Sequence, residues 1–358
     1  NLSQEYIRIQ LSELEESRID WSSYINDGSL KLHSKKELRD HQIKALNAIR
    51  DGLKNNDRGK MIMACGTGKT LTSLRIAEDL AGKGKKVLYM VPSLALMSQT
   101  IREWKNDSKD DFMAFSACSD EKVGKKKSTN DLIEVNLNDL AFPATTDAKK
   151  LSKQVQKTDN TKMTVIFSTY HSIDVISKSQ IKYNLDEFDL IICDEAHRTT
   201  GATLVDEDES HFVKIHSNEN VKGKKRLYMT ATPRIYGDTA RRREDEGEVT
   251  LASMDDKNIY GETLFHRGFG WAVENDLLTD YKVIVLMMDE QIVSDRIQST
   301  FTKSTELELD DATKMIGCYK ALAKVGLNEK DDQIKDSLKP MKKALAFCQN
   351  IRTSQIFS

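Results

Sequence analysis

The sequence has few cysteines, few prolines and no long apolar run, and each of these absences excludes a class of protein. Its five cysteines are widely spaced and form no CxxC pair, which excludes a disulfide scaffold, argues against a zinc site and fits a reducing compartment. Four prolines and 17 glycines are too few for a collagen-like chain. No run approaches the ~18 apolar residues of a membrane span, and the first 18 residues are polar and acidic, unlike a signal peptide. We therefore expect a cytoplasmic protein with no membrane partner.

The chain also has almost no net charge. Its 54 Lys and Arg residues nearly balance 56 Asp and Glu residues, for a formal net charge of −2. This balance at first argues against a nucleic-acid partner, because domains that bind nucleic acid are often basic. A hydrophobic fraction of 39% is enough for a core, and 358 residues suit two domains or one large domain with appendages.

Short apolar runs alternate with helical patterns along most of the chain. Runs that are apolar on both faces suit parallel strands buried between layers of helices, and the alternation predicts an α/β fold built from βαβ units. We expect one helix to begin at Asp40 as its N-cap and another to follow Gly68. The predicted strands lie at residues 60–65, 86–91, 163–168, 188–193, 226–230, 282–288 and 343–348.

Three charged regions interrupt this rhythm. Residues 107–161 are long and partly lysine-rich, with a helix predicted after Thr146. Residues 206–220 are acidic, and residues 235–257 carry three consecutive arginines followed by acids. Because charge runs are usually solvated, we interpret 107–161 and the stretches within 206–257 as insertions or mobile surface loops.

The strongest motif follows the first predicted strand and opens the next predicted helix. It consists of Ala64, Cys65, Gly66, Thr67, Gly68, Lys69 and Thr70. Glycines let backbone N–H groups curl around phosphates, and a helix N-terminus adds a favourable field for an anion. Lys69 is expected to neutralise the β- and γ-phosphates of ATP, and the Thr70 hydroxyl to hold Mg²⁺. The G-x-x-x-x-G-K-T pattern requires glycine where this chain has Met63, so the match is partial.

A second motif places two adjacent carboxylates directly after an apolar run. Asp194 and Glu195 follow the predicted strand at 188–193, and ligands of open α/β sheets bind at the carboxyl ends of strands. Asp194 is expected to coordinate Mg²⁺, directly or through water. Glu195 is expected to orient and deprotonate an attacking water molecule. Together with Lys69, these carboxylates are the predicted catalytic residues.

These two motifs resemble those of superfamily 2 helicases and translocases, whose P-loop typically reads A-x-x-G-x-G-K-T, so that Met63 is no longer a departure. Further short motifs stand in the family's order along the chain. Arg39 to Gln42 resembles the adenine-reading element, 91–93 motif Ia, 168–170 motif Ib, Asp194 to His197 the DEAH form of motif II, and 230–232 motif III. The resemblance implies a RecA-like parallel sheet flanked by helices, a P-loop NTPase with ATP and Mg²⁺ as cofactors.

The same resemblance implies roles for residues outside the two strongest motifs. Gln42, with Arg39 beside it, would hydrogen-bond the adenine edge, whereas Cys65 is expected to be a small packing residue of the phosphate loop. The expected contacts with nucleic-acid phosphates are Pro92, Ser93, Thr169 and Tyr170, and the expected coupling residues between ATP and movement are His197, Thr230 and Thr232.

Three longer stretches resemble a narrower family. EAHRTTGA at 195–202, MTATPRIYG at 229–237 and FPATTD at 142–147 are similar to the motor region of single-polypeptide Type I-like (Type ISP) restriction–modification enzymes. This resemblance implies an ATP hydrolase that moves along double-stranded DNA before the enzyme cleaves it. Such a motor needs a narrow track of weak phosphate contacts rather than a globally basic surface, so a net charge of −2 is compatible with it.

The resemblance also implies a domain plan. Residues 1–34 would be a linker or helical segment before the motor, 35–290 the first RecA-like ATPase domain, and 291–358 an inter-domain segment with the start of a second RecA-like domain. A strand at 343–348 and a helix at 349–358 would open that second domain. We interpret the sequence as a piece of a longer polypeptide that carries nuclease, methyltransferase and target-recognition domains. Since the arginine fingers of the second domain are absent, this piece should hydrolyse ATP poorly.

Two other functions remain open at this point. The first is a stand-alone DNA or RNA helicase of the same superfamily. The second is a nucleotide-dependent switch or scaffold that recruits a protein partner, for which the long insertion at 107–161 is the best support. A triplex-displacement assay separates a translocase from a strand-separating helicase. Partner capture without affinity for DNA would favour the scaffold.

Overall fold

The computed structural model describes residues 11–15, 17–118, 144–158, 160–204, 211–245 and 249–281, with single positions at 318, 343 and 345. The chain divides into two compact units, one of residues 1–125 with 135–279 and one of residues 126–134 with 280–358. The fold and the site described below belong to the first unit. Among the described residues, no helix combines the length and the apolar character needed to cross a membrane.

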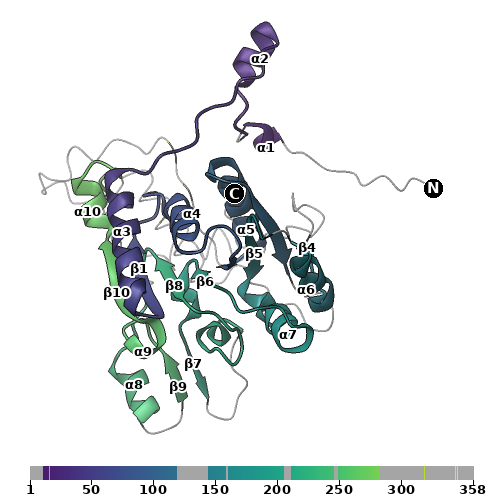
Figure 1. Ribbon diagram of the computed structural model, residues 1–358. Helices are drawn as coiled ribbons and strands as arrows, with labels where there is room; N and C mark the ends of the chain where they lie inside the picture. Colours follow the sequence, from purple (N-terminus) through teal and green to yellow (C-terminus); the bar gives the residue numbers. More distant parts are fainter. Residues whose placement is uncertain are drawn as a thin grey trace, which may run out of the picture. The chain divides into compact units, whose positions relative to one another are not determined.

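The first unit is built on an eight-stranded sheet whose neighbouring strands all pair in parallel (Figure 1). The strand order is β10-β1-β8-β6-β2-β5-β3-β4. Because the strands are parallel, their carboxyl ends meet at one edge of the sheet, where ligands bind in α/β folds. The strands are β1 (Arg58–Met63), β2 (Lys86–Val91), β3 (Phe112–Ala117), β4 (Ala144–Thr145), β5 (Met163–Thr169), β6 (Leu190–Cys193), β8 (Arg226–Thr230) and β10 (Glu262–Arg267).

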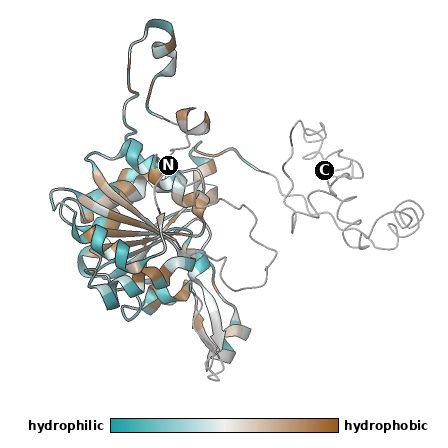
Figure 2. Ribbon diagram, turned by 90° about the vertical axis from the view of Figure 1, so that its right-hand side faces the viewer, coloured by the Kyte–Doolittle hydropathy of each residue, from teal (hydrophilic) through white to brown (hydrophobic). Residues whose placement is uncertain are grey.

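Helices cover both faces of the sheet. The helices α3 (Asp40–Asn55), α4 (Lys69–Leu80) and α5 (Leu94–Asp107) contribute side chains to one hydrophobic cluster, and α6 (Ala148–Gln156) and α7 (Ile173–Tyr183) contribute to the other. In Figure 2 the strands are largely brown, and the helices around them alternate between teal and brown along their length. The shorter elements are α1 (Leu11–Glu15), α2 (Trp21–Asp27), η2 (Tyr170–Ser172), η3 (Ala196–Thr199), β7 (Gly201–Leu204), η4 (Val213–His216), α8 (Asp238–Asp245), β9 (Val249–Ala252), α9 (Lys257–Tyr260) and α10 (Phe269–Glu274).

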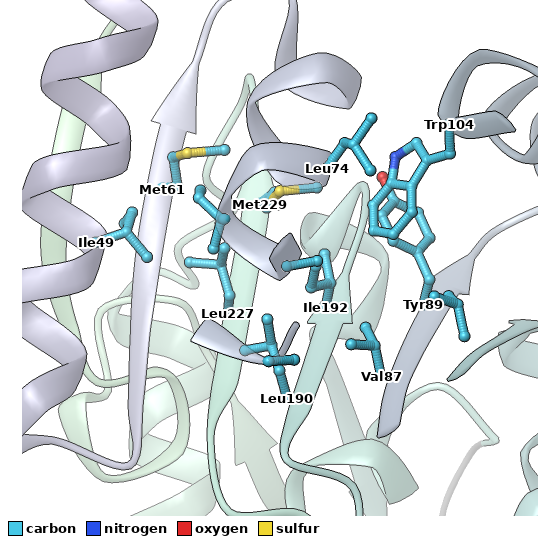
Figure 3. Close-up of a cluster of buried hydrophobic side chains, with 14 of the residues drawn as sticks. Ile49, Met61, Leu74, Val87, Tyr89, Trp104, Leu190, Ile192, Leu227 and Met229 are labelled. Carbon is cyan, nitrogen blue, oxygen red and sulfur yellow. The ribbon is translucent and has the colours of Figure 1, made fainter. Parts of the chain in front are cut away.

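Strand β2 shows why the sheet is apolar on both faces. Val87 and Tyr89 belong to the cluster under α3, α4 and α5, whereas the intervening Leu88 belongs to the cluster under α6 and α7. Figure 3 shows the first cluster, in which Tyr89 lies beside Trp104 of α5, with ring centroids 5.0 Å apart in an edge-on arrangement. Each fully buried side chain of this size contributes about 1.5–3 kcal/mol to folding. Because successive side chains of β2 point to opposite faces of the sheet, the strand packs against helices on both faces.

Much of the predicted α/β architecture is confirmed. The runs at 60–65, 86–91, 163–168, 188–193 and 226–230 correspond to β1, β2, β5, β6 and β8, and the helices expected near Asp40, Gly68 and Thr146 are α3, α4 and α6. One detail differs: Arg39 is the N-cap of α3 and Asp40 is its first residue. The predicted strand at 282–288 and the helix at 349–358 lie outside the described residues, and of the predicted strand at 343–348 only positions 343 and 345 are described.

Three strands of the sheet, β3, β4 and β10, escaped the sequence prediction. β3 lies in the stretch at 107–161 that was interpreted as an insertion, yet it pairs with β5 over six residues, and α6 packs on α7 in the same layer. Within that stretch, residues 119–143 lie outside the described part. β10 pairs with β1 at one end of the sheet, and Phe265 is its one buried residue, flanked by exposed and partly buried ones. Strand β10 therefore has no continuous apolar run to reveal it.

Candidate nucleotide-binding site

The loop between β1 and α4 has a backbone that only glycine adopts without strain at two positions. Gly66 has φ +78° and Gly68 has φ +90°, both in the left-handed region. A Cβ atom added to Gly68 would collide with the side-chain amide of Gln42. Because α4 begins at Lys69, directly after these glycines, the N-terminal end of a 12-residue helix faces this loop. The loop therefore combines a tight cradle with the field that favours an anion.

The carboxylates predicted after β6 do lie beside this loop. Lys69 Nζ is 3.9 Å from Glu195 Oε1, and its side chain is only 11% exposed. The Lys69 ammonium also donates a hydrogen bond to the Met63 carbonyl, at 3.4 Å. The structure thus brings together one lysine and two carboxylates that are 125 residues apart in the sequence.

Asp194 is the most deeply buried of these carboxylates. Burial, with the neighbouring charge of Glu195, raises the pKa of Asp194 to about 6. Its Oδ2 accepts a hydrogen bond from the Tyr89 hydroxyl, at 3.4 Å, and its main-chain carbonyl accepts one from the Tyr170 hydroxyl, at 2.7 Å. A buried carboxylate with a raised pKa gains from a nearby cation, which the Lys69 ammonium supplies in part.

Glu195 has an unusual backbone. Its φ of +48° and ψ of +47° place a non-glycine residue in the left-handed region, which costs roughly 1–2 kcal/mol. The Glu195 N–H donates to Asp194 Oδ1, at 3.0 Å, and the Glu195 carbonyl accepts from the Arg198 N–H, at 2.9 Å. Such a conformation persists only where the surroundings fix it, and it is found most often at functional sites.

The three residues predicted to couple ATP to movement lie together. His197 Nδ1 is 3.0 Å from Thr230 Oγ1 and 3.3 Å from Glu195 Oε2. Thr230 Oγ1 also accepts a hydrogen bond from the Thr232 N–H, at 3.1 Å. Burial lowers the pKa of His197, which favours the neutral ring. A continuous chain of contacts therefore joins the carboxylate of Glu195 to the end of β8.

Gln42 grips the phosphate loop through its side-chain amide. Its Nε2 donates to the carbonyls of Thr67, at 3.3 Å, and Gly68, at 3.1 Å, and its Oε1 accepts from the Arg39 N–H, at 2.8 Å. His41 Nε2 donates to the same Thr67 carbonyl, at 2.9 Å. His41 was not among the predicted site residues, although it stands next to Gln42 in the sequence. The start of α3 is thus bound to the loop at several points.

The loop also contacts residues 267–278, which lie near the C-terminal end of the first unit in the sequence. The Arg267 carbonyl at the end of β10 accepts the Ala64 N–H, at 3.0 Å. The Trp271 ring of α10 lies 5.7 Å from the ring of His41, and a Cβ atom on Gly66 would sit 3.2 Å from the side chain of Leu278. These contacts could not be predicted from the sequence, because the residues that make them follow no nucleotide-binding pattern.

The four predicted nucleic-acid contacts are placed very differently. Ser93 is exposed, and its Oγ accepts the Leu96 N–H as the N-cap of α5. Pro92 and Thr169 are buried, and Thr169 Oγ1 is hydrogen-bonded to Ser172, at 2.8 Å. Tyr170 is fully buried with its hydroxyl on the Asp194 carbonyl. The Tyr170 side chain therefore supports the carboxylate loop from within the core, and we no longer expect it to contact a phosphate.

Two of the predicted P-loop residues have other contacts. The Thr70 carbonyl accepts from Trp104 Nε1, at 3.2 Å, and from Ser73 Oγ, at 2.8 Å, so the first turn of α4 is fixed from α5. Cys65 is exposed, and its Sγ lies 4.0 Å from Lys69 Nζ. These contacts leave the P-loop anchored on both sides.

Comparison with known proteins gives one family and several relatives. Residues 35–235 match the model of the family ResIII, described as Type III restriction enzyme, res subunit. The structure of the ATP-dependent Type ISP restriction–modification enzyme LlaBIII bound to DNA is 41% identical, covers 88% of this chain and 21% of that one, and has a TM-score of 0.70. The structure of a nuclease-deletion mutant of the Type ISP enzyme LlaGI in complex with a DNA substrate mimic is 36% identical. It covers 85% of this chain and 26% of that one, and has a TM-score of 0.52.

A curated relative extends the comparison to a virus. The probable helicase A859L of African swine fever virus (isolate Tick/Malawi/Lil 20-1/1983) is 28% identical over 248 residues, which are 69% of this chain and 24% of that protein. This chain therefore spans about a quarter or less of the length of each of these relatives.

Proposed function

Because this chain belongs to the ResIII family, the Type III restriction enzyme res subunit family, we propose that it is the ATP-driven motor of a restriction–modification enzyme and moves along double-stranded DNA. The chain carries a superfamily 2 helicase-like domain with a RecA-like α/β fold. The observation that supports hydrolysis most directly is the 3.9 Å approach of Lys69 to Glu195 beside the glycine cradle. A binding module has no need of a second, partly exposed carboxylate beside that cradle.

The donor set fits magnesium and a nucleotide triphosphate. Gly66 and Gly68 shape a loop that a Cβ atom would fill, and hydroxyl and carboxylate oxygens are the ligands that Mg²⁺ prefers. Thr70 and Asp194 would hold the ion. When bound, Mg²⁺ would supply positive charge against the β- and γ-phosphates. Lys69 adds a fixed ammonium on the same side.

The hydrolytic step uses Glu195 as the base. Its carboxylate would accept a proton from a water molecule as the water oxygen bonds to the γ-phosphorus, and the bond from that phosphorus to the β–γ bridging oxygen breaks to release ADP. His197, at 3.3 Å, holds the other carboxylate oxygen and is itself held by Thr230. A change at Glu195 during the reaction would thereby be felt at the end of β8.

The amide of Gln42 predicts a preference for adenine. Its Nε2 is committed to two loop carbonyls, and among the described residues only the Arg39 N–H donates to its Oε1. The second lone pair of Oε1 can accept the exocyclic amino group of adenine, whereas guanine would present a carbonyl oxygen there. We expect ATP to bind about tenfold more tightly than GTP, which equals ~1.4 kcal/mol.

Competition of each triphosphate against a fluorescent ADP analogue measures this preference. A purine riboside triphosphate, with hydrogen in place of the amino group, should bind with intermediate affinity. If ATP and GTP compete equally well, Gln42 does not read the base.

Double-stranded DNA is the proposed track. Both solved restriction–modification relatives are complexes with DNA or a DNA substrate mimic, and this supports the same partner here. Ser93 stands exposed at the N-terminus of α5, at the edge of the sheet where β2 ends, and suits a sequence-independent phosphate contact. We also propose that nuclease, methyltransferase and target-recognition domains act with this motor, as in enzymes of that class.

A stand-alone helicase is the second candidate, because the viral relative is named a probable helicase. The two candidates differ in what happens to the duplex. A translocase should displace a triplex-forming strand from linear duplex DNA in the presence of MgATP and leave the duplex paired, whereas a helicase should separate its strands.

The full-length protein and its Lys69→Ala variant provide this test. We expect triplex displacement by the first and none by the second. Lys54→Ala, at an exposed lysine near the end of α3, is the matched control and should retain displacement. Strand separation would favour the helicase, and the absence of both activities would contradict the motor assignment.

A further inference from the structure

A short segment between β7 and β8 contacts both sides of the strained Glu195 loop. We call residues 211–216, which include η4, the brace. The brace lies outside every motif considered above, in a stretch that the sequence prediction treated as an insertion. Through Phe212 it contacts Tyr170 of motif Ib, and through His216 it contacts residues beside motif II and motif III.

One end of the brace reaches the residue before Glu195. The Phe212 ring stacks on the ring of Tyr170, with centroids 5.3 Å apart and an angle of 29° between the planes. The Tyr170 hydroxyl in turn donates to the Asp194 carbonyl, at 2.7 Å. Tyr170 is fully buried, so its position is set by Phe212 and by the core around it. The peptide group that leads into Glu195 is therefore held from the brace side.

The other end of the brace holds the residue that closes the Glu195 loop. His216 Nε2 lies 3.0 Å from the Thr199 carbonyl, and His216 Nδ1 lies 3.0 Å from the Tyr228 hydroxyl. A carbonyl only accepts, so Nε2 carries the proton and Nδ1 accepts from Tyr228. The hydroxyl of Thr199 adds hydrogen bonds with the Ala196 carbonyl, at 2.8 Å, and the Tyr260 hydroxyl, at 3.0 Å. This end of η3 is consequently fastened to β8 through one imidazole ring.

The brace rests on a rigid base. The side chain of Arg226, fully buried on β8, donates to the carbonyls of Ile215, at 3.0 Å, and Val221, at 2.6 Å. Lys214 Nζ pairs with Asp174 of α7, at 3.0 Å. The backbone of the brace is therefore fixed to the sheet at Ile215, and the Lys214 side chain ties the brace to α7.

We propose that the brace holds Glu195 in its left-handed conformation, and that Phe212 and His216 are positioning residues for ATP hydrolysis. The inference rests on the proposed ATPase function of the same site. Asp194 and Thr199 bound the turn that carries Glu195, and each has its carbonyl held by the brace, through Tyr170 in one case and directly in the other. Releasing either end lets the backbone of Glu195 relax toward an ordinary conformation, and its carboxylate leaves the position beside Lys69.

Two variants release the two ends separately. Phe212→Leu removes the aromatic stack, and His216→Gln leaves a side chain that cannot bridge Thr199 and Tyr228 together. Single-turnover ATP hydrolysis is measured with the full-length protein. We expect each variant to lower the rate about 10- to 100-fold and to leave the MgATP dissociation constant within about twofold of the wild-type value. Amide hydrogen exchange should accelerate at residues 195–200 and stay unchanged in the P-loop and β1.

The control and the fallback lie nearby. Lys224→Ala removes an exposed ion pair with Asp189 in the same stretch of chain and should change neither readout. If His216→Gln loses protection across the whole sheet, that variant is unfolded, and Tyr228→Phe, which removes one hydroxyl, takes its place with the same expectations.

The outcomes separate the brace from the proposed function. Wild-type rates and wild-type exchange at 195–200 in both variants would overturn the brace, as would a fall in rate without faster exchange there. If the two variants exchange faster at 195–200 but the wild-type protein hydrolyses no ATP, the result would support the brace as a structural clamp and reject the proposed ATPase.

Discussion

Glu195→Gln should lower the rate of ATP hydrolysis by about 10²–10⁴-fold, the usual contribution of a general base. The amide cannot accept the proton of the attacking water molecule, but it keeps the size of the carboxylate and a hydrogen-bond acceptor near His197. Removing the negative charge of Glu195 also removes its repulsion of Asp194, which together with the larger effect of burial raises the pKa of Asp194 in the native protein. MgATP should therefore bind at least as well as before.

A rapid-quench measurement with radiolabelled ATP, together with equilibrium binding of a fluorescent analogue, checks both halves of this expectation. Glu187→Gln provides the matched control, because Glu187 is an exposed carboxylate before β6 and outside the site. Hydrolysis by Glu195→Gln at more than a tenth of the wild-type rate would show that another group takes the proton.

Gly68→Ala should abolish nucleotide binding in practice. The φ of +90° is strained for alanine, and the added methyl group would meet the Gln42 amide that holds the loop. To accommodate it, Gln42 must leave the carbonyls of Thr67 and Gly68, and the loop loses its shape. We expect the dissociation constant for MgATP to rise at least about 100-fold, equivalent to ~2.7 kcal/mol.

Equilibrium titration and thermal unfolding measure the two consequences of this substitution. Gly270→Ala is a sharp control, since its added Cβ meets nothing within 4 Å and its φ is not in the left-handed region. Gly270 also lies within α10, where alanine is favoured over glycine. Near-normal ATP binding by Gly68→Ala would mean that the loop has a second conformation suited to phosphates.

The central strands could be predicted because both of their faces are buried. β2 and β6 read as continuous apolar runs, and such runs need no knowledge of their neighbours. β10 could not be predicted in this way, because it lies at the end of the sheet and only Phe265 among its residues is buried. β3 directly follows a charged stretch of the sequence, which masks its apolar character. The strand becomes recognisable only through its pairing with β5.

The site shows the same division between local and distant information. Lys69, Asp194 and Glu195 stand in contiguous motifs at strand ends, so sequence order alone placed them together. Tyr170 was also recognised by its motif, but its orientation depends on Phe212, 42 positions later. Contacts between residues so far apart are decided by packing, and no short pattern contains them.

Across the sheet, the motifs lie in an order that differs from their order along the chain. Motif III follows β8, which lies between the P-loop strand β1 and the carboxylate strand β6, and motifs Ia and Ib follow the next two strands, β2 and β5. Adjacent strands are ~4.8 Å apart, so four steps separate β1 from β5 by roughly 19 Å. The P-loop and motif Ib are thus set apart by a fixed span of close to two nanometres, with the carboxylates that follow β6 between them. The number of intervening strands fixes this spacing between the motifs, and a change in the length of a loop does not alter it.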